Sequence, residues 1–260
     1  MKKQFFTNAP SHRNAHDLFA DKWACDLGEI DASLPSGGMP GFRGDPRPAQ
    51  AAARLGRDGR FDGYDVLELG PLEAAHTYQL ERLGAARITA VEANSEAFLK
   101  CLIVKNIARL DRSTFLLGDA MGYLAAPGPR HDLIFACGIL YHMQDPVELI
   151  RLAAARSDRL FLWTHYYADV PPLKHLRPRT YQGHGLSVPT YEMTYRNSGL
   201  GTFWGGNRAS TNWLELPTIL AVLAHFGLTE TVVIADDHDH RYGPNVTLAA
   251  SRPGAAPPAA

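Results

Sequence analysis

The chain has 260 residues, of which 45% are hydrophobic and 20% charged, and its formal net charge is −1. These values are typical of a soluble globular protein with one α/β domain, or with one domain that carries an insertion. The near-zero charge excludes a bulk basic field that would draw the protein to nucleic acid, and no apolar run reaches the roughly 18 residues needed to cross a bilayer. We therefore expect neither a membrane nor a nucleic-acid partner.

Residues 1–60 have no regular pattern and form either a loose leader or a lid. The stretch SLPSGGMPGFRGDPRP holds four prolines and four glycines in 16 residues, which rules out a long helix there. The N-terminus MKKQFFTNAP lacks the apolar core of a signal peptide, and the three widely spaced cysteines imply no disulfide framework. A reducing cytoplasm is the expected location.

From Tyr64 the pattern becomes regular, and five short apolar runs predict buried strands. Helical spacing between them predicts three helices, with Ser95 as the N-cap of the second and Asp145 as the N-cap of the third. The strands are expected at 65–70, 87–94, 113–120, 131–142 and 158–167, and the helices at 72–84, 95–110 and 145–157. Such alternation implies a parallel sheet with right-handed crossovers.

Regular alternation stops after the fifth strand, and residues 168–212 form an insertion without a sustained period. A helix is expected again at 212–227, followed by two strands at 229–237 and 245–251. The short connection HDHRYGP between them suits an antiparallel pair. We therefore assign residues 61–251 to one α/β domain and residues 252–260 to a disordered tail.

Parallel sheets bind ligands at the carboxyl ends of their strands, and carboxylates gather at these ends. Glu68 lies in the first strand, which ends at Gly70, and Glu92 ends the second strand, 22 residues after Gly70. An acidic residue there can accept hydrogen bonds from a ribose diol. Pyrophosphate needs several glycines and a bare helix N-terminus, whereas GPLEAAH offers Pro71 and Glu73, and Glu73 would repel phosphate. A phosphate-free, positively charged nucleoside such as S-adenosylmethionine fits better.

Two later strand ends support the same cofactor. Asp119 follows the third strand in LLGDAM, where a carboxylate can meet the adenine amino group. Cys137 and Gly138 end the fourth strand, and their small size lets a cofactor lie close to the backbone.

With these motifs in order, the region from Val66 to about Ser251 resembles the class I S-adenosylmethionine-dependent methyltransferases. The matching stretches are VLELG, VEAN, GDA and CGILYHMQDP, although VLELG keeps only one glycine of the family's E/D-x-G-x-G-x-G pattern. The resemblance implies a three-layer Rossmann-like α/β fold with a seven-stranded, mostly parallel sheet whose last strand is antiparallel. CGILYHMQDP is also similar to GVLYHRxxP of the tRNA wobble-uridine carboxymethyltransferases.

The resemblance implies roles for the residues in these motifs. Glu92 would hold the ribose hydroxyls, Asp119 the adenine edge, and Glu68 with Gly70 the methionine moiety. The other matched positions expected at the cofactor are Ala93, Asn94, Gly118, Ala120, Cys137 and Gly138. Alternatively, each carboxylate is only a solvated cap or a salt-bridge partner at a strand end.

Methyl transfer to a hydroxyl needs a base beside the methyl carbon, and histidine has a suitable pKa. His142 follows the fourth strand and His165 the fifth, so both are candidate catalytic residues. The alternative for each is a structural residue bonded to backbone or water. Tyr141 and Tyr166 are expected to shape the acceptor pocket.

The insertion at 168–212 is expected to cover the acceptor site. Tyr191 and Trp204 can stack on a planar or sugar-like substrate, and Asn207 and Arg208 can bind its polar groups. The aromatics fit equally a small satellite core, and Arg208 fits a solvated surface charge.

The expected function is methyl transfer from S-adenosylmethionine to an O, N or S atom of a small-molecule or sugar-like acceptor. RNA modification, suggested by GILYH, and a non-catalytic scaffold role stay open as alternatives. His238 and His240 lie two apart in DDHDHRYGP, but a polar turn suits this loop better than a metal site, so we expect no metal. The pattern identifies neither the acceptor nor the oligomeric state.

Overall fold

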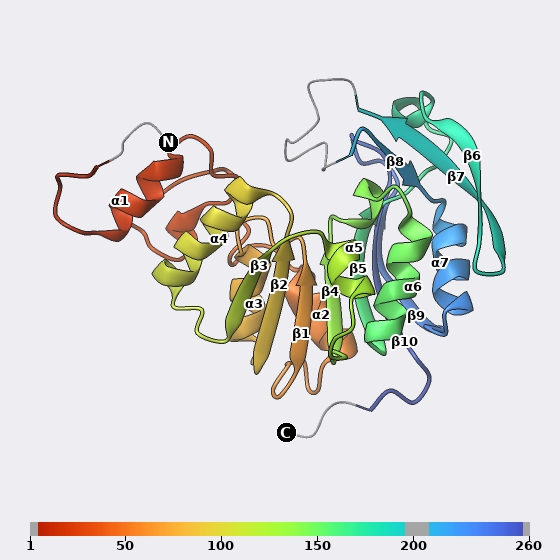
Figure 1. Cartoon of the computed structure of the whole chain (residues 1–260), viewed down its shortest axis with the longest axis horizontal. Coiled ribbons are helices and arrows are strands. Elements are labelled where there is room, and N and C mark those ends of the chain that lie inside the picture. Colours follow the sequence, from red (N-terminus) through yellow and green to blue (C-terminus); the bar gives the residue numbers. More distant parts are fainter. Residues whose placement is uncertain (1–4, 196–207, 257–260) are drawn as a thin grey trace.

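A seven-stranded sheet forms the centre of this computed structural model, which describes residues 5–195 and 208–256 (Figure 1). The strand order is β3-β2-β1-β4-β5-β10-β9. The strands are β1 (Asp65–Leu69), β2 (Arg87–Glu92), β3 (Ser113–Leu117), β4 (Leu133–Cys137), β5 (Arg159–His165), β9 (Glu230–Asp237) and β10 (Asn245–Ser251). Only β10 runs antiparallel to the other strands of this sheet, which confirms the expected fold class.

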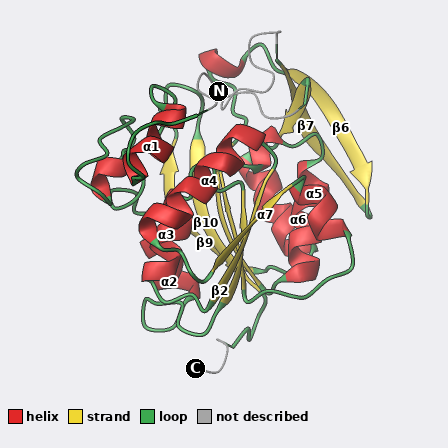
Figure 2. Ribbon diagram, turned by 60° about the vertical axis from the view of Figure 1, so that its left-hand side comes forward, coloured by secondary structure: helices red, strands yellow, loops and turns green. Residues whose placement is uncertain are grey.

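Helices cover both faces of this sheet (Figure 2). One face carries α2 (Arg47–Leu55), α3 (Ala75–Arg82) and α4 (Ser95–Ala108); the other carries α5 (Ala120–Ala125), α6 (Pro146–Arg156) and α7 (Leu216–His225). Successive strand residues point to opposite faces, so Val66 belongs to the core cluster that includes α2 and α3, while Leu67 belongs to the cluster that includes α5, α6 and α7. Because both faces are buried, the strands form the continuous apolar runs seen in the sequence.

Helix α6 begins as predicted, but α3 begins at Ala75 and α7 at Leu216, later than the expected 72 and 212, and α4 has a different cap. Asp145 caps α6 by accepting a hydrogen bond from the backbone N–H of Glu148 at 2.8 Å, as predicted. The prediction of Ser95 as the cap of α4 is wrong, because the Asn94 side chain accepts from the N–H of Ala97 at 3.0 Å. Only Ala93 and Asn94 separate the end of β2 at Glu92 from the start of α4 at Ser95, so Asn94 occupies the cap position.

The N-terminal segment contains short helices and packs firmly on α3 and α4. Besides α2 it holds α1 (His12–His16) and the 3₁₀ helices η1 (Asp17–Phe19) and η2 (Leu27–Glu29). Phe42 is fully buried, and the Glu29 carboxylate accepts hydrogen bonds from the backbone N–H groups of Phe42, Arg43 and Gly44. Helix α2 forms despite Pro48 because proline is tolerated in a first helical turn.

The insertion folds into a second sheet, although its sequence shows no sustained period. Strands β6 (Arg177–Gly183), β7 (Leu186–Thr194) and β8 (Ser210–Trp213) are antiparallel and lie beside α6 and α7, beyond the end of β5 (Figure 1). The β6–β7 turn has two residues, His184 and Gly185, with φ of 52° and 76°. Two positive φ values in a two-residue loop match the twist of a hairpin, so this turn fixes the register.

Candidate functional site

The loop after β1 adopts a glycine-loop shape with a single glycine. Gly70, Leu72 and Ala74 have φ of 73°, 55° and 61°, and they occupy the three glycine positions of E-x-G-x-G-x-G counted from Glu68. A left-handed backbone costs an L-residue roughly 1–2 kcal/mol, so the surroundings must hold Leu72 and Ala74 in place.

Glu92 helps to keep Leu72 in this conformation. Its carboxylate accepts hydrogen bonds from the backbone N–H groups of Leu72 at 3.1 Å and Asn94 at 2.8 Å, which joins the loops after β1 and β2. Burial raises the pKa of Glu92, and these N–H donors oppose the rise. A carboxylate has about four lone-pair sites, so two bonds leave capacity for ribose hydroxyls.

Glu73 fastens the N-terminal segment to the same loop. Its buried carboxylate receives the Lys100 ammonium at 2.8 Å and the backbone N–H groups of Ala24 and Cys25 at 3.0 and 2.9 Å. The expectation that Glu73 would repel a phosphate on this loop is therefore wrong, because its charge is neutralised inside the protein.

Glu68 is buried with an unused oxygen. Its side chain is 1% exposed, and the Thr77 hydroxyl donates to Oε2 at 2.5 Å. Its Oε1 atom has no hydrogen-bond partner within the described ranges. Burial raises the pKa of Glu68 to about 8, with a further rise from Glu92. A buried orphan oxygen implies a missing partner, and the ammonium of S-adenosylmethionine has the chemistry to supply one.

The other expected cofactor residues lie at the ends of β2, β3 and β4. The N–H of Gly118 donates to the Glu92 carbonyl at 2.9 Å, which brings the ends of β2 and β3 together. Asp119 is exposed, and its side chain caps α5 through the N–H of Gly122 at 3.3 Å. Ala93 and Asn94 are also exposed, whereas Ala120 is buried in α5.

Gly138 allows close packing at the end of β4. Its φ is 80°, and a side chain there would lie 3.6 Å from the Trp163 ring and 3.8 Å from the Tyr141 hydroxyl. Cys137, one residue earlier, is partly buried. Small residues therefore keep the backbone accessible between two aromatic side chains.

Both candidate bases are neutral at pH 7. His165 donates from Nδ1 to the carbonyls of Gly243 and Pro244 at 2.9 and 3.2 Å, so its Nε2 is the acceptor nitrogen, and burial lowers its pKa. Burial and the neighbouring His165 lower the pKa of His142 to about 4, and its Nδ1 lies 3.5 Å from the Tyr195 hydroxyl. Both histidines can therefore accept a proton.

Aromatic rings surround His165. It stacks on Trp213 at 5.6 Å, meets the Tyr141 ring edge-on at 5.0 Å, and lies 5.3 Å from the Trp163 ring. The buried Trp213 Nε1 makes no hydrogen bond to any residue that the structure describes. These rings line the ends of β4 and β5 with apolar faces and one unused donor.

Two residues expected at the acceptor have their hydroxyls bonded inside the protein. Tyr166 donates to Asp236 at 2.8 Å. Tyr191 stacks on Tyr167 at 3.4 Å and donates to Glu215 at 2.5 Å, and this bond raises the pKa of Tyr191 to about 12. Tyr166 belongs to the main core cluster and Tyr191 packs against a small satellite cluster, while their expected acceptor contacts stay predictions.

The remaining insertion residues are placed only in part. Arg208 is exposed at the start of a described segment. Trp204 and Asn207 lie outside the described residues, so their expected acceptor contacts stay predictions.

The N-terminal segment brings to this edge a charged group that the sequence analysis did not predict. Arg47, the first residue of α2, lies over the Trp163 ring with its guanidinium carbon 4.7 Å from the ring centroid. Asp45 accepts hydrogen bonds from Arg47 and, at 2.9 Å, from His76. No sequence pattern links residues 45–47 to β5, because only the tertiary packing of α2 brings them together.

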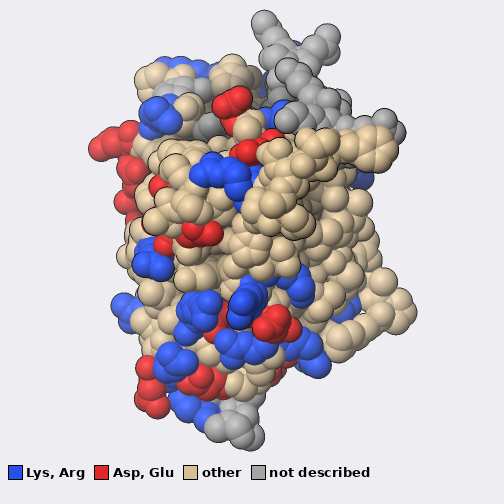
Figure 3. Space-filling model, turned by 90° about the vertical axis from the view of Figure 1, so that its left-hand side faces the viewer, with Lys and Arg blue, Asp and Glu red and all other residues tan. Residues whose placement is uncertain are grey.

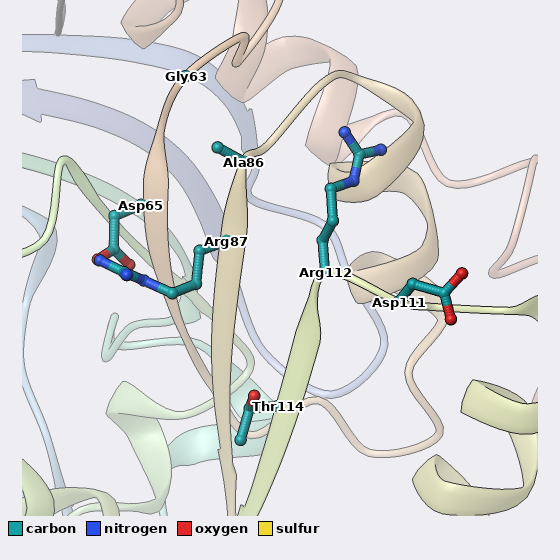
Figure 4. A pocket seen from close by; sticks show the side chains of 7 residues that line it. All are labelled: Gly63, Asp65, Ala86, Arg87, Asp111, Arg112 and Thr114. Atoms are coloured by element: carbon teal, nitrogen blue, oxygen red, sulfur yellow. The ribbon is translucent and has the colours of Figure 1, made fainter.

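Two surface hollows lie outside this cluster. One of about 310 Å³ lies where β6 and β7 face the start of α6, with Arg179 and Asn212 in its lining. The larger, about 540 Å³, lies among the amino ends of β1, β2 and β3, where Asp65 and Arg87 form an ion pair (Figure 4). Lys and Arg side chains gather in the lower half of the face in Figure 3, with Asp and Glu side chains among them.

Residues 5–195 and 208–256 contain neither a cluster of metal ligands nor a helix that could span a membrane. No three His, Cys, Asp or Glu side chains come together there as metal ligands. No helix in the same ranges has the length and apolarity that a membrane span requires.

Comparisons with known proteins relate the chain to methyltransferases by fold. No family model and no curated protein sequence matches it. The N-terminal domain of EvdMO1, solved with S-adenosylhomocysteine and D-fucose, is similar with a TM-score of 0.69 and 21% identity, covering 93% of this chain and 94% of that one.

A second similar structure is the magnesium protoporphyrin IX methyltransferase of Synechocystis PCC 6803 with bound S-adenosylhomocysteine. Its TM-score is 0.51 and its identity 18%, over 79% of this chain and 81% of that one. The CcbJ methyltransferase of Streptomyces caelestis has a TM-score of 0.50 and 14% identity, over 87% and 96% of the two chains. At such identities the similarity is one of architecture, and this chain has the fold of the S-adenosylmethionine-dependent methyltransferases.

Proposed function

We propose that the protein is an S-adenosylmethionine-dependent methyltransferase that acts on a small-molecule or sugar-like acceptor. The observation that carries the proposal is the buried Glu68 carboxylate with its unused Oε1, beside Glu92 at the strand ends. The fold adds support, since similar structures were solved with S-adenosylhomocysteine.

The residues divide between holding the cofactor and receiving a proton. Glu68 faces the ammonium, Glu92 the ribose hydroxyls and Asp119 the adenine edge. When bound, S-adenosylmethionine supplies an electrophilic methyl group on a positively charged sulfur. His165 would accept the acceptor's hydroxyl proton at Nε2 during methyl transfer. The backbone carbonyls at Nδ1 fix the tautomer that this step needs.

His142 is the second candidate for the base. Its lowered pKa keeps it unprotonated in mildly acidic solution, but it also makes the residue a weaker proton acceptor than His165. The Tyr195 hydroxyl beside it can orient the ring.

A sugar-like acceptor suits the surroundings of His165. Tyr141, Trp163 and Trp213 present ring faces and edges, on which sugar rings pack well through their C–H groups. D-fucose was present with the similar EvdMO1 domain, which supports the same class of acceptor here. Neither RNA modification nor a scaffold role has a comparable observation in its favour, because carboxylates rather than Lys or Arg mark these strand ends.

Calorimetry with S-adenosylmethionine, followed by transfer of labelled methyl groups to a panel of free sugars including D-fucose, tests the proposal. We expect the wild type to bind the cofactor and His165→Asn to lose roughly 10²–10⁴-fold in turnover with unchanged cofactor affinity. Glu148→Gln, at a half-buried position of α6 whose carboxylate pairs with Arg151, is the matched control. A folded protein that binds no S-adenosylmethionine would refute the assignment.

A further inference from the structure

Arg47 is held rigidly at the edge of the candidate site. It begins α2 after Pro46, its side chain is 23% exposed, and its guanidinium lies flat enough over Trp163 to reach 4.7 Å from the ring centroid. An arginine stacked on an indole loses little further entropy when it binds a ligand, because its rotamer is already fixed.

Asp45 sets the orientation of that guanidinium. Its carboxylate accepts from Nε of Arg47 at 2.9 Å and from Nη2, and it also accepts from Nε2 of His76 at 2.9 Å. Burial by itself would raise the pKa of Asp45, but the bonds from Arg47 and His76 hold it well below its usual range. Burial lowers the pKa of His76, so His76 is a neutral donor and the charges here are those of Asp45 and Arg47.

The Asp45 contact uses one edge of the guanidinium only. Arginine carries five N–H donors in a planar fork, and Nε with one Nη2 hydrogen serve Asp45. The opposite edge, formed by both terminal nitrogens, is the geometry that binds a second planar anion with two parallel hydrogen bonds.

The guanidinium acts on the same residues that the cofactor is expected to contact. Arg47 and Glu68 both influence the pKa of Cys137 at the end of β4, the first lowering it and the second raising it. Arg47 also interacts electrostatically with Tyr141. A cation and a carboxyl group with an unpartnered oxygen therefore both act on one strand end, and a zwitterionic ligand needs one group of each kind.

We propose that Arg47 binds a carboxylate group in the methyl-transfer site, with Asp45 holding its guanidinium against Trp163. This inference rests on the proposed function. The carboxylate belongs either to the methionine end of the cofactor or to an acidic acceptor, and the two sources share the same chemistry at Arg47.

The first arm of the test compares S-adenosylmethionine with decarboxylated S-adenosylmethionine, which lacks only the carboxylate. Calorimetry is run on the wild type, Asp45→Asn, Arg47→Gln and the double variant Asp45→Asn/Arg47→Gln. The double variant leaves no unpaired buried charge, so it stays informative if Arg47→Gln alone fails to fold. If the cofactor supplies the carboxylate, the variants without Arg47 lose about 10- to 100-fold of the preference for S-adenosylmethionine, and Asp45→Asn, whose amide oxygen can still accept from Nε, loses less.

The second arm compares glucuronate with glucose on protein saturated with S-adenosylhomocysteine. If the acceptor supplies the carboxylate, the cofactor preference survives without Arg47, and the preference for glucuronate falls by about 10-fold or more. If neither preference differs between the wild type and the double variant, Arg47 binds no carboxylate and the inference is overturned. A wild type that binds S-adenosylmethionine normally in that case leaves the proposed function standing, whereas a wild type that does not bind it refutes both.

Discussion

Replacing Glu68 with glutamine should stabilise the protein without ligand at high pH and weaken its hold on the cofactor. The carboxyl is 1% exposed, and burial raises its pKa from the ordinary 4.5 to about 8. Between these values the unfolded chain has released the proton while the folded chain keeps it, so the folded state loses stability as pH rises. At about 1.36 kcal/mol for each pH unit, the full penalty above pH 8 is about 5 kcal/mol.

Urea denaturation without ligand at about pH 4 and about pH 9 measures this effect. Glu68→Gln keeps the shape of the side chain and can still bond the Thr77 hydroxyl, so it should gain about 3–5 kcal/mol at the higher pH and almost nothing at the lower. Glu148→Gln, whose parent carboxylate has its pKa lowered by Arg151, should show no such gain. Parallel stability curves for Glu68→Gln and the wild type would contradict the burial argument.

The same variant reports on the cofactor. An ammonium beside Oε1 favours the carboxylate form, so binding of S-adenosylmethionine at about pH 7 should release a proton from the wild type. Calorimetry in buffers of different ionisation enthalpy counts that proton. Glu68→Gln should release none and should bind about 10-fold or more weakly, since a charged hydrogen bond contributes about 1.5–3 kcal/mol.

Three further variants test other contacts. Glu92→Ala should weaken cofactor binding by about 1–3 kcal/mol in calorimetry and lower the melting temperature as well, because it also frees the Leu72 backbone; unchanged affinity would remove it from the site. Glu73→Gln leaves Lys100 buried without its partner and should cost about 3–5 kcal/mol in urea denaturation, and adding Lys100→Met should recover part of that loss. Between about pH 6.5 and about pH 4, His142 is protonated in the unfolded chain but not in the folded chain, so the folded state loses stability as the pH falls. His142→Asn should reduce this loss, as measured by urea denaturation at a series of pH values. An unchanged pH dependence of stability would contradict the burial of His142.

The sheet was predictable because its strands are buried on both faces. Val66 and Leu67 pack under different helix layers, and that double burial produces apolar runs that a sequence reader can recognise. The gathering of Glu68 and Glu92 followed from the same pattern, since parallel strands bring their carboxyl ends to one edge.

The strands of the insertion were not recognised because β6 is mostly exposed and β7 mostly half-buried. Their residues alternate without a strong apolar face, so the periodicity that marks a half-buried strand is weak. The two-residue turn at His184 and Gly185 was the one local signal, and it is a weaker one than Asn-Gly.

Arg47 and the loop conformation depended on tertiary contacts that no local pattern encodes. Leu72 and Ala74 would be assigned negative φ on propensity alone, yet both are left-handed. Ala74 is fully buried, and the residue between them, Glu73, is fixed by Lys100. The packed surroundings thus impose a backbone shape that glycines would otherwise provide.

Contacts with the N-terminal segment, rather than glycines, therefore maintain the conformation of the proposed cofactor loop. Glu73 is satisfied by the backbone of Ala24 and Cys25, and the loop beside it is bonded to Glu92, so the strained residues keep their shape only while that segment stays docked. A loop with three glycines would adopt the same turns without help, because glycine has no Cβ to strain. The same segment also delivers Arg47 to Trp163 at the acceptor edge. Docking of residues 20–50 therefore shapes the cofactor loop and supplies the edge of the acceptor site in a single packing event, so the two halves of the site should form or fail together.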